Sequence, residues 1–204
     1  MTRPLYAQLS LPAMRANLAR ARELAPGTQL LAVVKANAYG HGLMRLLPAL
    51  AEADGLALLE LDAAIALRAA HYMRRILLLE GFFTPDELPE VAARRLAVVV
   101  HSEDQVRMLE LARLERPLEV FVKVNTGMNR LGIPVDQIDA ALARLEATGS
   151  VAEITLMTHF ADADGPEGVT AQLARFEAAT QGLPLPRSLA NSAALLRHPQ
   201  TRGD

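Results

Sequence analysis

The chain has 204 residues, 51% of them hydrophobic, with a formal net charge of −2 and no cysteine. This size and apolar content predict one domain with a substantial core, while the near-neutral charge and 4% aromatic content argue against a nucleic-acid-binding surface. The lack of cysteine excludes disulfides and thiolate metal ligands, and neither a signal-peptide core nor an apolar run of ~20 residues is present. We therefore expect a cytoplasmic protein without membrane contacts.

Helical and strand patterns alternate along the chain. A short alternating stretch at 7–11 leads into a helix that Ser10 can cap and that Pro26-Gly27 ends. Seven apolar runs have the length and composition of buried strands, at 30–34, 56–59, 76–79, 96–100, 120–124, 154–157 and, more weakly, 187–191. Helical patterns fall between them, including 43–53, 61–72, 138–149, 169–180 and a short one after 193, with capping boxes expected at Thr84 with Glu87 and at Ser102 with Gln105.

This alternation continues over residues 1–204 without a break in composition, which predicts a single α/β domain with a parallel sheet covered by helices. A doubly wound sheet and a (β/α)8 barrel both fit the periodicity. The Rossmann form of the doubly wound sheet is disfavoured because no G-x-G-x-x-G fingerprint follows the first strand.

The run at 30–34 ends on Lys35, and glycines at 40 and 42 interrupt the pattern before the next helix. A lysine at the carboxyl end of a buried strand opens onto the face where α/β folds bind ligands, and its neutral amine can attack a carbonyl carbon. From this spacing alone, a solvated lysine at the end of the strand is the more frequent case.

The letters Ala32-Val-Val-Lys-Ala-Asn-Ala-Tyr-Gly-His-Gly resemble the lysine motif of bacterial alanine racemases, enzymes that use pyridoxal 5′-phosphate. The resemblance implies that Lys35 forms the Schiff base with this cofactor and that Tyr39 reaches its phosphate. It also implies that the sheet is a (β/α)8 barrel of the TIM type.

A second segment, Phe121-Val-Lys-Val-Asn-Thr-Gly-Met-Asn-Arg-Leu-Gly, places Arg130 in a polar loop at the same carboxyl face. The planar guanidinium suits a carboxylate or a phenolic oxygen, although position alone leaves an exposed loop arginine equally probable. The segment is similar to the racemase motif in which this arginine contacts the cofactor's phenolic oxygen and the substrate carboxylate. In some members the lysine at the position of Lys123 is carbamylated and supports that arginine.

Three further residues follow strands. His159 ends the sixth apolar run, and the resemblance implies that it packs beside the cofactor's pyridine ring. A metal site with Asp162 and Asp164 is disfavoured because no second histidine stands at ligand spacing, so we expect a solvated loop and no metal. Asn191 and Ser192 lie where a strand gives way to a helix, which fits a plain N-cap or a phosphate seat, and the resemblance implies phosphate contact. A Ser-His-Asp hydrolase lacks its G-x-S-x-G elbow.

A closed barrel has eight strands and about 250 residues, whereas the chain provides seven strand patterns. In the family, a strand with an arginine and then a carboxy-terminal β domain follow, and that domain contributes a catalytic tyrosine across a homodimer. We therefore expect the amino-terminal barrel of a racemase without its last strand and with an open sheet edge.

The resulting hypothesis is the interconversion of L-alanine and D-alanine with Lys35 as one of two bases. Because the second base is absent, we expect no useful turnover from these 204 residues alone. Two alternatives stay open: a non-catalytic single-barrel carrier of pyridoxal 5′-phosphate and a racemase of broad amino-acid specificity.

Overall fold

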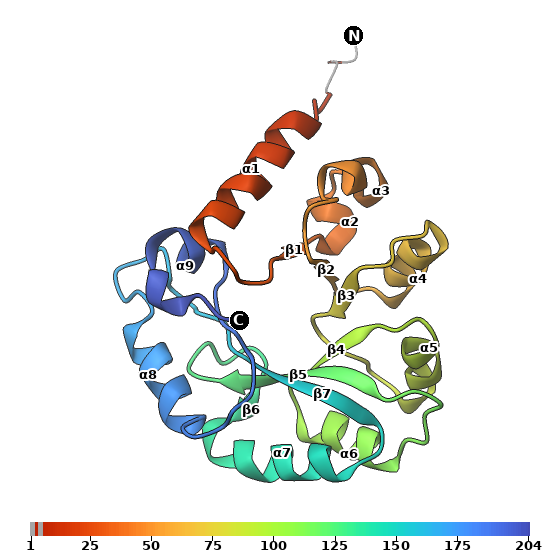
Figure 1. Ribbon diagram of the computed structural model, residues 1–204, viewed down its shortest axis with the longest axis vertical. Helices are drawn as coiled ribbons and strands as arrows, with labels where there is room; N and C mark the ends of the chain where they lie inside the picture. The colour runs from red at the N-terminus through yellow and green to blue at the C-terminus, as the bar shows by residue number, and fades with distance from the viewer. Residues whose placement is uncertain (1–2, 4–5) are drawn as a thin grey trace.

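The computed structural model describes residue 3 and residues 6–204, and in this part of the chain parallel strands curl into an incomplete barrel (Figure 1). The strands follow the order β1-β2-β3-β4-β5-β7-β8, with the short β6 beside β5. Their bounds are β1 Leu31–Val33, β2 Gly55–Leu58, β3 Arg75–Leu78, β4 Ala97–Val100, β5 Leu118–Asn125, β6 Ile133–Pro134, β7 Val151–Met157 and β8 Arg187–Ser188. The predicted barrel without its last strand is confirmed, and residues 7–10 are irregular.

Helices form the outer ring, connecting successive strands. They are α1 Leu11–Leu24, α2 Lys35–Tyr39, α3 Leu43–Leu46, α4 Leu61–Ala69, α5 Leu88–Ala93, α6 Glu103–Leu111, α7 Ile138–Ala147, α8 Thr170–Ala179 and α9 Ser192–Arg197, with 3-10 turns η1 Leu47–Ala49, η2 Pro85–Glu87, η3 Val135–Gln137 and η4 Pro199–Thr201. The helix predicted at 43–53 was wrong in extent. It breaks into α3 and η1 because Pro48 has no N–H and its ring clashes with the preceding turn.

The predicted helix caps are partly confirmed. Ser10 and Ser102 each accept a bond from the amide three residues on, at 3.3 Å. The capping box at Thr84 was wrong, because the Thr84 side chain makes no cap bond and Glu87 instead accepts from the Phe83 amide at 2.7 Å. Gln105 likewise reaches the amide one residue before the cap.

Side chains alternate between two layers of core, as the period of two in a strand requires. One set faces the helices and is buried, including Leu58, Leu78, Val100 and Val122. The other set fills the barrel interior with Ala57, Leu77, Ala97, Val99 and Phe121, each 3% exposed or less. The interior is therefore a packed core, and only the inward positions beyond it, at the carboxyl ends of the strands, can meet a ligand.

The gap between β8 and β1 is bridged at the amino-terminal end of the sheet. The Asp204 amide donates to the Arg187 carbonyl at 3.0 Å, and the Asp204 carbonyl accepts from the Gln29 amide at 3.4 Å. Helix α1 packs against η1 and α9 and so covers this gap from outside. The sheet path still ends at β1 and β8, as expected of an open barrel.

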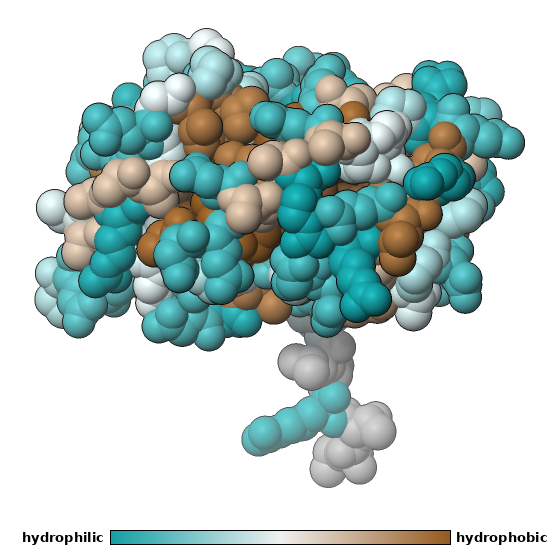
Figure 2. Space-filling view, turned by 90° about the horizontal axis from the view of Figure 1, so that it is seen from below, coloured by the Kyte–Doolittle hydropathy of each residue, from teal (hydrophilic) through white to brown (hydrophobic). Residues whose placement is uncertain are grey.

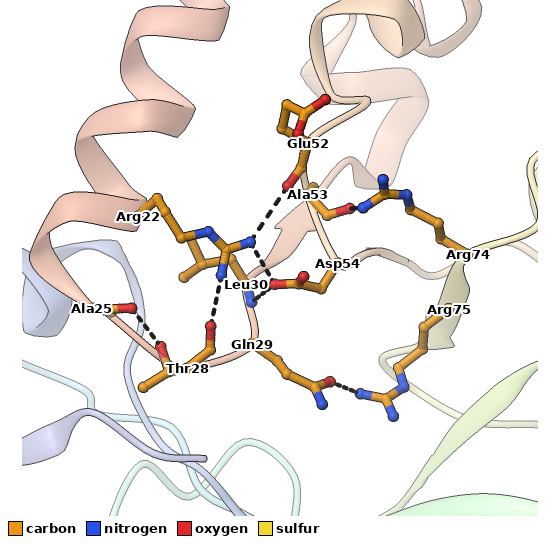
Figure 3. A network of polar contacts seen from close by, with 10 residues as sticks. All are labelled: Arg22, Ala25, Thr28, Gln29, Leu30, Glu52, Ala53, Asp54, Arg74 and Arg75. Carbon is orange, nitrogen blue, oxygen red and sulfur yellow. Dashed lines mark hydrogen bonds and ion pairs between the residues drawn. The ribbon is translucent and has the colours of Figure 1, made fainter.

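A polar network joins α1 to the first two strands on the same side of the molecule (Figure 3). One Asp54 oxygen accepts from Arg22 at 2.6 Å and from the Leu30 amide at 2.7 Å. Burial alone would raise the pKa of Asp54, but the Leu30 amide and the Arg22 guanidinium together bring that pKa below its ordinary value. The network fixes the entry of the chain into β1.

Candidate active site

The predicted site residues converge at the carboxyl ends of the strands, here called the barrel mouth. On β5 the inward-facing Phe121 is followed two residues later by Lys123, and in the same way Met157 of β7 is followed by His159. Lys35 lies two residues beyond Val33, the last residue of β1, and its backbone is at the same end of the sheet. The 204-residue sequence has nineteen arginines but only two lysines, and both lysines are thus at the mouth.

The charges at the mouth act on one another. Burial lowers the pKa of Lys123, and the neighbouring Arg130 and Lys35 lower it further, against an opposing effect of Glu80. Lys123 is 8% exposed and makes no hydrogen bond or ion pair with any residue that the structure describes. Three basic side chains, those of Lys35, Lys123 and Arg130, thus lie near enough to influence one another, which favours an anionic ligand at the mouth.

His159 is neutral in this setting. Burial lowers its pKa to about 4, with further lowering by Lys123, Arg130 and Lys35. No group of three or more His, Asp or Glu side chains capable of holding a metal occurs in residues 3 and 6–204. The ring is therefore suited to packing and hydrogen bonding rather than to carrying charge.

Sequence reasoning assigned no role to His101, yet it belongs to the same ring of residues. It follows the inward-facing Val99 of β4, and its Nε2 lies 3.2 Å from the Glu80 carbonyl oxygen. Burial lowers the pKa of His101, and the nearby Lys123 lowers it as well. Its position two residues past an inner strand residue was the signal that could have identified it.

The segment after Lys35 is one turn of left-handed helix. Ala36, Asn37, Ala38 and Tyr39 have φ values of 50°, 54°, 56° and 55°. A left-handed conformation costs an L-residue roughly 1–2 kcal/mol, so four in a row cost on the order of 4–8 kcal/mol. Such a run persists only where surrounding contacts over-determine it, and these outliers cluster at functional sites. This turn could not be predicted from the residue types, because none of the four is glycine.

Tyr39 ends this turn and is 59% exposed. Within the part of the chain that the structure describes, no hydrogen bond joins Tyr39 to Lys35 or to the start of α9. Its side chain is therefore open to solvent, and its hydroxyl group makes no hydrogen bond with a described residue.

Arg130 is exposed on the loop between β5 and β6. Asn125 shapes this loop, because its Oδ1 accepts from the amides of Gly127 at 3.2 Å and Asn129 at 3.1 Å. Gly132 (φ +135°) brings the chain back so closely that a Cβ there would lie 2.8 Å from the Asn125 nitrogen. The loop thus returns Arg130 to the mouth after the strand has ended.

A buried polar network joins the loops that carry Arg130 and His159. The Thr126 and Thr158 hydroxyls are 2.8 Å apart, and Gln172 of α8 donates to Thr126 Oγ1 and to the His159 carbonyl, each at 3.1 Å. Gln172 Oε1 also accepts from the Ala161 amide at 2.8 Å. Thr126, Thr158 and Gln172 are all 9% exposed or less, so the bonds among these three side chains are in a poorly solvated setting.

Asn191 is an N-cap, one of the two alternatives that the sequence left open. Its Oδ1 accepts from the Ala194 amide at 2.9 Å, and its Nδ2 donates to the Phe160 carbonyl at 3.0 Å. Ser192 begins α9 and is exposed, and its hydroxyl makes no hydrogen bond within residues 3 and 6–204. Through Phe160, the start of α9 is tied to the end of β7.

The loop that follows His159, predicted to be solvated, has Asp164 exposed and Asp162 half-buried, and it carries hydrogen bonds at both residues. Asp162 Oδ2 accepts from the Glu167 amide at 2.9 Å, and the Asp164 carbonyl accepts from Arg197 of α9 at 2.5 Å. The first bond closes the loop on itself, and the second holds it against α9. Neither carboxylate is directed at a metal-binding cluster among the described residues.

Two hollows on the outer surface lie away from the mouth. One of about 370 Å³ lies between α5 and α6 and is lined by Leu88, Met108 and Leu111 among others. Another of about 760 Å³ lies at the ends of α6 and α7, where Arg144 and Glu110 meet. Figure 2 shows the molecule from below, with hydrophobic patches between hydrophilic residues. Because neither hollow contains a mouth residue, the site is assigned on its chemistry rather than on its depth.

Comparison with known proteins agrees with the family resemblance of the sequence motifs. Residues 9–204 match the family described as "Alanine racemase, N-terminal domain". The chain belongs to this family. Over its whole length it is 51% identical to the alanine racemase of Erwinia tasmaniensis and 49% identical to the catabolic alanine racemase of Klebsiella aerogenes, and it covers 57% of each.

The family's barrel is also seen in a solved structure. The biosynthetic alanine racemase from Pseudomonas aeruginosa superposes with a TM-score of 0.90 at 41% identity, over 95% of this chain and 55% of that one. The predicted fold class is thereby confirmed. The chain spans little more than half the length of the relatives it matches, and no described helix is long and apolar enough to cross a membrane.

Proposed function

We propose that the chain is the cofactor-binding barrel of a pyridoxal 5′-phosphate-dependent enzyme that interconverts L-alanine and D-alanine. The observation that carries this proposal is the position of Lys35, on a strained turn beside Lys123 and Arg130, in a chain of the alanine racemase family. A cytoplasmic location and a homodimeric full-length protein are part of the same proposal, since the family resemblance implies a second base from a partner subunit.

The donor set at the mouth fits an anionic aromatic aldehyde. Lys35 offers an amine for covalent attachment, and Arg130 offers a guanidinium for the phenolic oxygen and for the carboxylate of alanine. Tyr39, the exposed Ser192 hydroxyl and the α9 start shaped by Asn191 would hold the phosphate. When bound, the cofactor supplies the electron sink that lets the α-carbon of an amino acid lose its proton.

The residues of the chain then decide where the proton goes. Released Lys35 would exchange the α-proton on one face of the substrate, and a tyrosine from the partner subunit would do so on the other. The neutral ring of His159 would pack beside the pyridine ring without adding a fourth positive charge. Arg130 would orient the substrate carboxylate so that only the bond to the α-proton is presented to these bases.

Lys123 is proposed as the modifiable lysine of the site. Its buried amine has a lowered pKa, so a larger neutral fraction is available to attack carbon dioxide. That reaction forms an N–C bond, releases a proton and leaves a carbamate anion. The product would pair with Arg130 and would remove the repulsion among three cations.

The test uses the fact that the sequence has only two lysines. Pyridoxal 5′-phosphate is titrated into the 204-residue chain, and the absorbance band of the Schiff base is recorded. The adduct is then reduced with borohydride and mapped by peptide mass spectrometry. We expect label on Lys35, loss of the band in Lys35→Ala and retention of label on Lys35 in the matched variant Lys123→Ala. Label confined to Lys123 or to the amino terminus would refute the assignment.

Racemisation assays separate the enzyme from the non-catalytic carrier. We expect the 204 residues alone to give no useful turnover of L-alanine, and a chimera that joins them to the carboxy-terminal part of a full-length relative to turn it over. A panel of other amino acids tests broad specificity. Turnover by the 204 residues at the rate of a full-length relative would show that a second base is not needed from outside the barrel.

A further inference from the structure

The left-handed turn after Lys35 receives a hydrogen bond from a different βα unit. Glu60 follows β2, and its Oε1 accepts from the Ala36 amide at 3.1 Å. Its Oε2 accepts from the Leu59 amide at 3.3 Å. The carboxylate therefore links the end of β2 to the first residue of the turn. Bonds from an ionised acceptor to backbone amides are stronger than neutral ones.

Glu60 occupies a position where a side chain ordinarily serves its own helix. It is the N-cap residue of α4, yet its side chain makes no cap bond to that helix. The carboxylate turns instead toward Ala36 of the preceding βα unit. The Glu60 side chain thus stabilises the left-handed turn rather than the start of its own helix.

The other end of the turn is held locally. Asn37 Oδ1 accepts from the Leu43 amide at 2.8 Å, and the Asn37 carbonyl accepts from the Gly42 amide at 2.9 Å. The Ala38 amide donates to the Val34 carbonyl at 2.8 Å. Within residues 3 and 6–204, Glu60 is the one side chain outside 34–43 that hydrogen-bonds this turn.

We propose that Glu60 is a positioning residue for Lys35. By fixing the Ala36 amide, it fixes the peptide plane that joins Lys35 to the turn, and with it the direction in which the lysine amine and the Tyr39 ring are presented. The inference rests on the proposed role of Lys35 as the cofactor-binding lysine, and it adds a residue whose carboxylate does not itself need to touch the cofactor.

The experiment compares Glu60→Ala, Glu60→Gln and the control Asp62→Ala in the 204-residue chain. Asp62 lies in the first turn of α4 and is exposed, so its removal deletes the same charge without touching Ala36. Circular dichroism checks that each variant is folded. Without cofactor, NMR measures the exchange rate of the Ala36 amide and the carbon shifts of 36–39, which report left-handed backbone.

In Glu60→Ala we expect about tenfold faster exchange at Ala36 and shifts moved toward ordinary backbone values. The affinity for pyridoxal 5′-phosphate, followed by borohydride trapping on Lys35, should fall about tenfold, which equals about 1.4 kcal/mol. Glu60→Gln keeps an acceptor oxygen and should restore both properties, and Asp62→Ala should match the unaltered chain in both.

Unchanged exchange and shifts in a folded Glu60→Ala variant would overturn the inference. So would a changed turn with unchanged attachment at Lys35, since Glu60 would then hold the backbone without positioning the amine. If the unaltered chain shows no attachment at Lys35, the proposed function fails, and with it the claim that Glu60 positions that amine. In that case the NMR measurement still decides separately whether Glu60 holds the turn.

Discussion

Gln172 is the residue whose removal tests how the barrel mouth is held together. In Gln172→Leu, the His159 carbonyl and the Ala161 amide lose their bonds to this side chain, and Thr126 Oγ1 loses one of its partners. Leucine has a similar volume, so the change is mainly one of hydrogen bonding. Gln172 is 9% exposed, so water cannot fully replace the amide.

The expected cost follows from the partners left behind. A buried polar group without a partner costs about 1–3 kcal/mol. Thr126 keeps its contact with Thr158, and the Ala161 amide can reach water, so the His159 carbonyl dominates and we expect a loss of about 2 kcal/mol. For a domain of this size that corresponds to roughly 4–8 °C in Tm.

Urea unfolding followed by circular dichroism measures this loss. The matched control is Gln181→Leu, an exposed glutamine just after α8, which should change stability by less than about 0.5 kcal/mol. Combining Gln172→Leu with Thr126→Val should cost less than the sum of the two, by roughly 0.5–1.5 kcal/mol, because the two side chains are bonded to each other. Strict additivity, or a loss for Gln172→Leu no larger than that of the control, would refute the network.

Three further outcomes are expected. Burial lowers the pKa of His101 and lowers that of His159 to about 4, so below the ordinary histidine pKa the unfolded chain binds more protons than the folded chain, and stability should fall as pH drops from about 6.5 toward 4. His159→Gln should recover about 1 kcal/mol of that loss, a value reduced for solvent screening because the ring is partly exposed, and denaturant midpoints measured across this pH range test it. Gly81→Ala should cost roughly 2–4 kcal/mol in the same unfolding assay, since Gly81 has φ +71° and a Cβ would overlap a backbone oxygen of β4, whereas Gly149→Ala meets nothing within 4 Å and should be neutral. Asp54→Ala should lower stability by about 1–2 kcal/mol at pH 7, because it removes the acceptor drawn in Figure 3. Since the pKa of Asp54 is depressed, this difference between the variant and the unaltered chain should vanish only as pH falls through the lowered pKa, and a difference that persists in strong acid would count against the carboxylate as its source.

Much of the fold could be predicted from the sequence, because the patterns that indicate strands, helices and caps depend on neighbouring residues. The apolar run at 30–34, the strand pattern at 120–124 and the cap at Ser102 each depend on a few neighbouring residues, and all three are present in the structure. The boundary of the helix after Gly42 was missed although Pro48 marked it. The letters around Lys35 indicated the family that residues 9–204 match.

How these segments meet depends on long-range packing and could not be predicted from local patterns. Strand register and the curl of the sheet bring Lys35, Lys123 and Arg130 close enough to lower the pKa of His159, although these residues are far apart in the sequence. The left-handed turn could not be read from its alanines, since local preference opposes it and contacts from other segments, Glu60 among them, sustain it. Local patterns set the elements, and long-range packing set the geometry of the site.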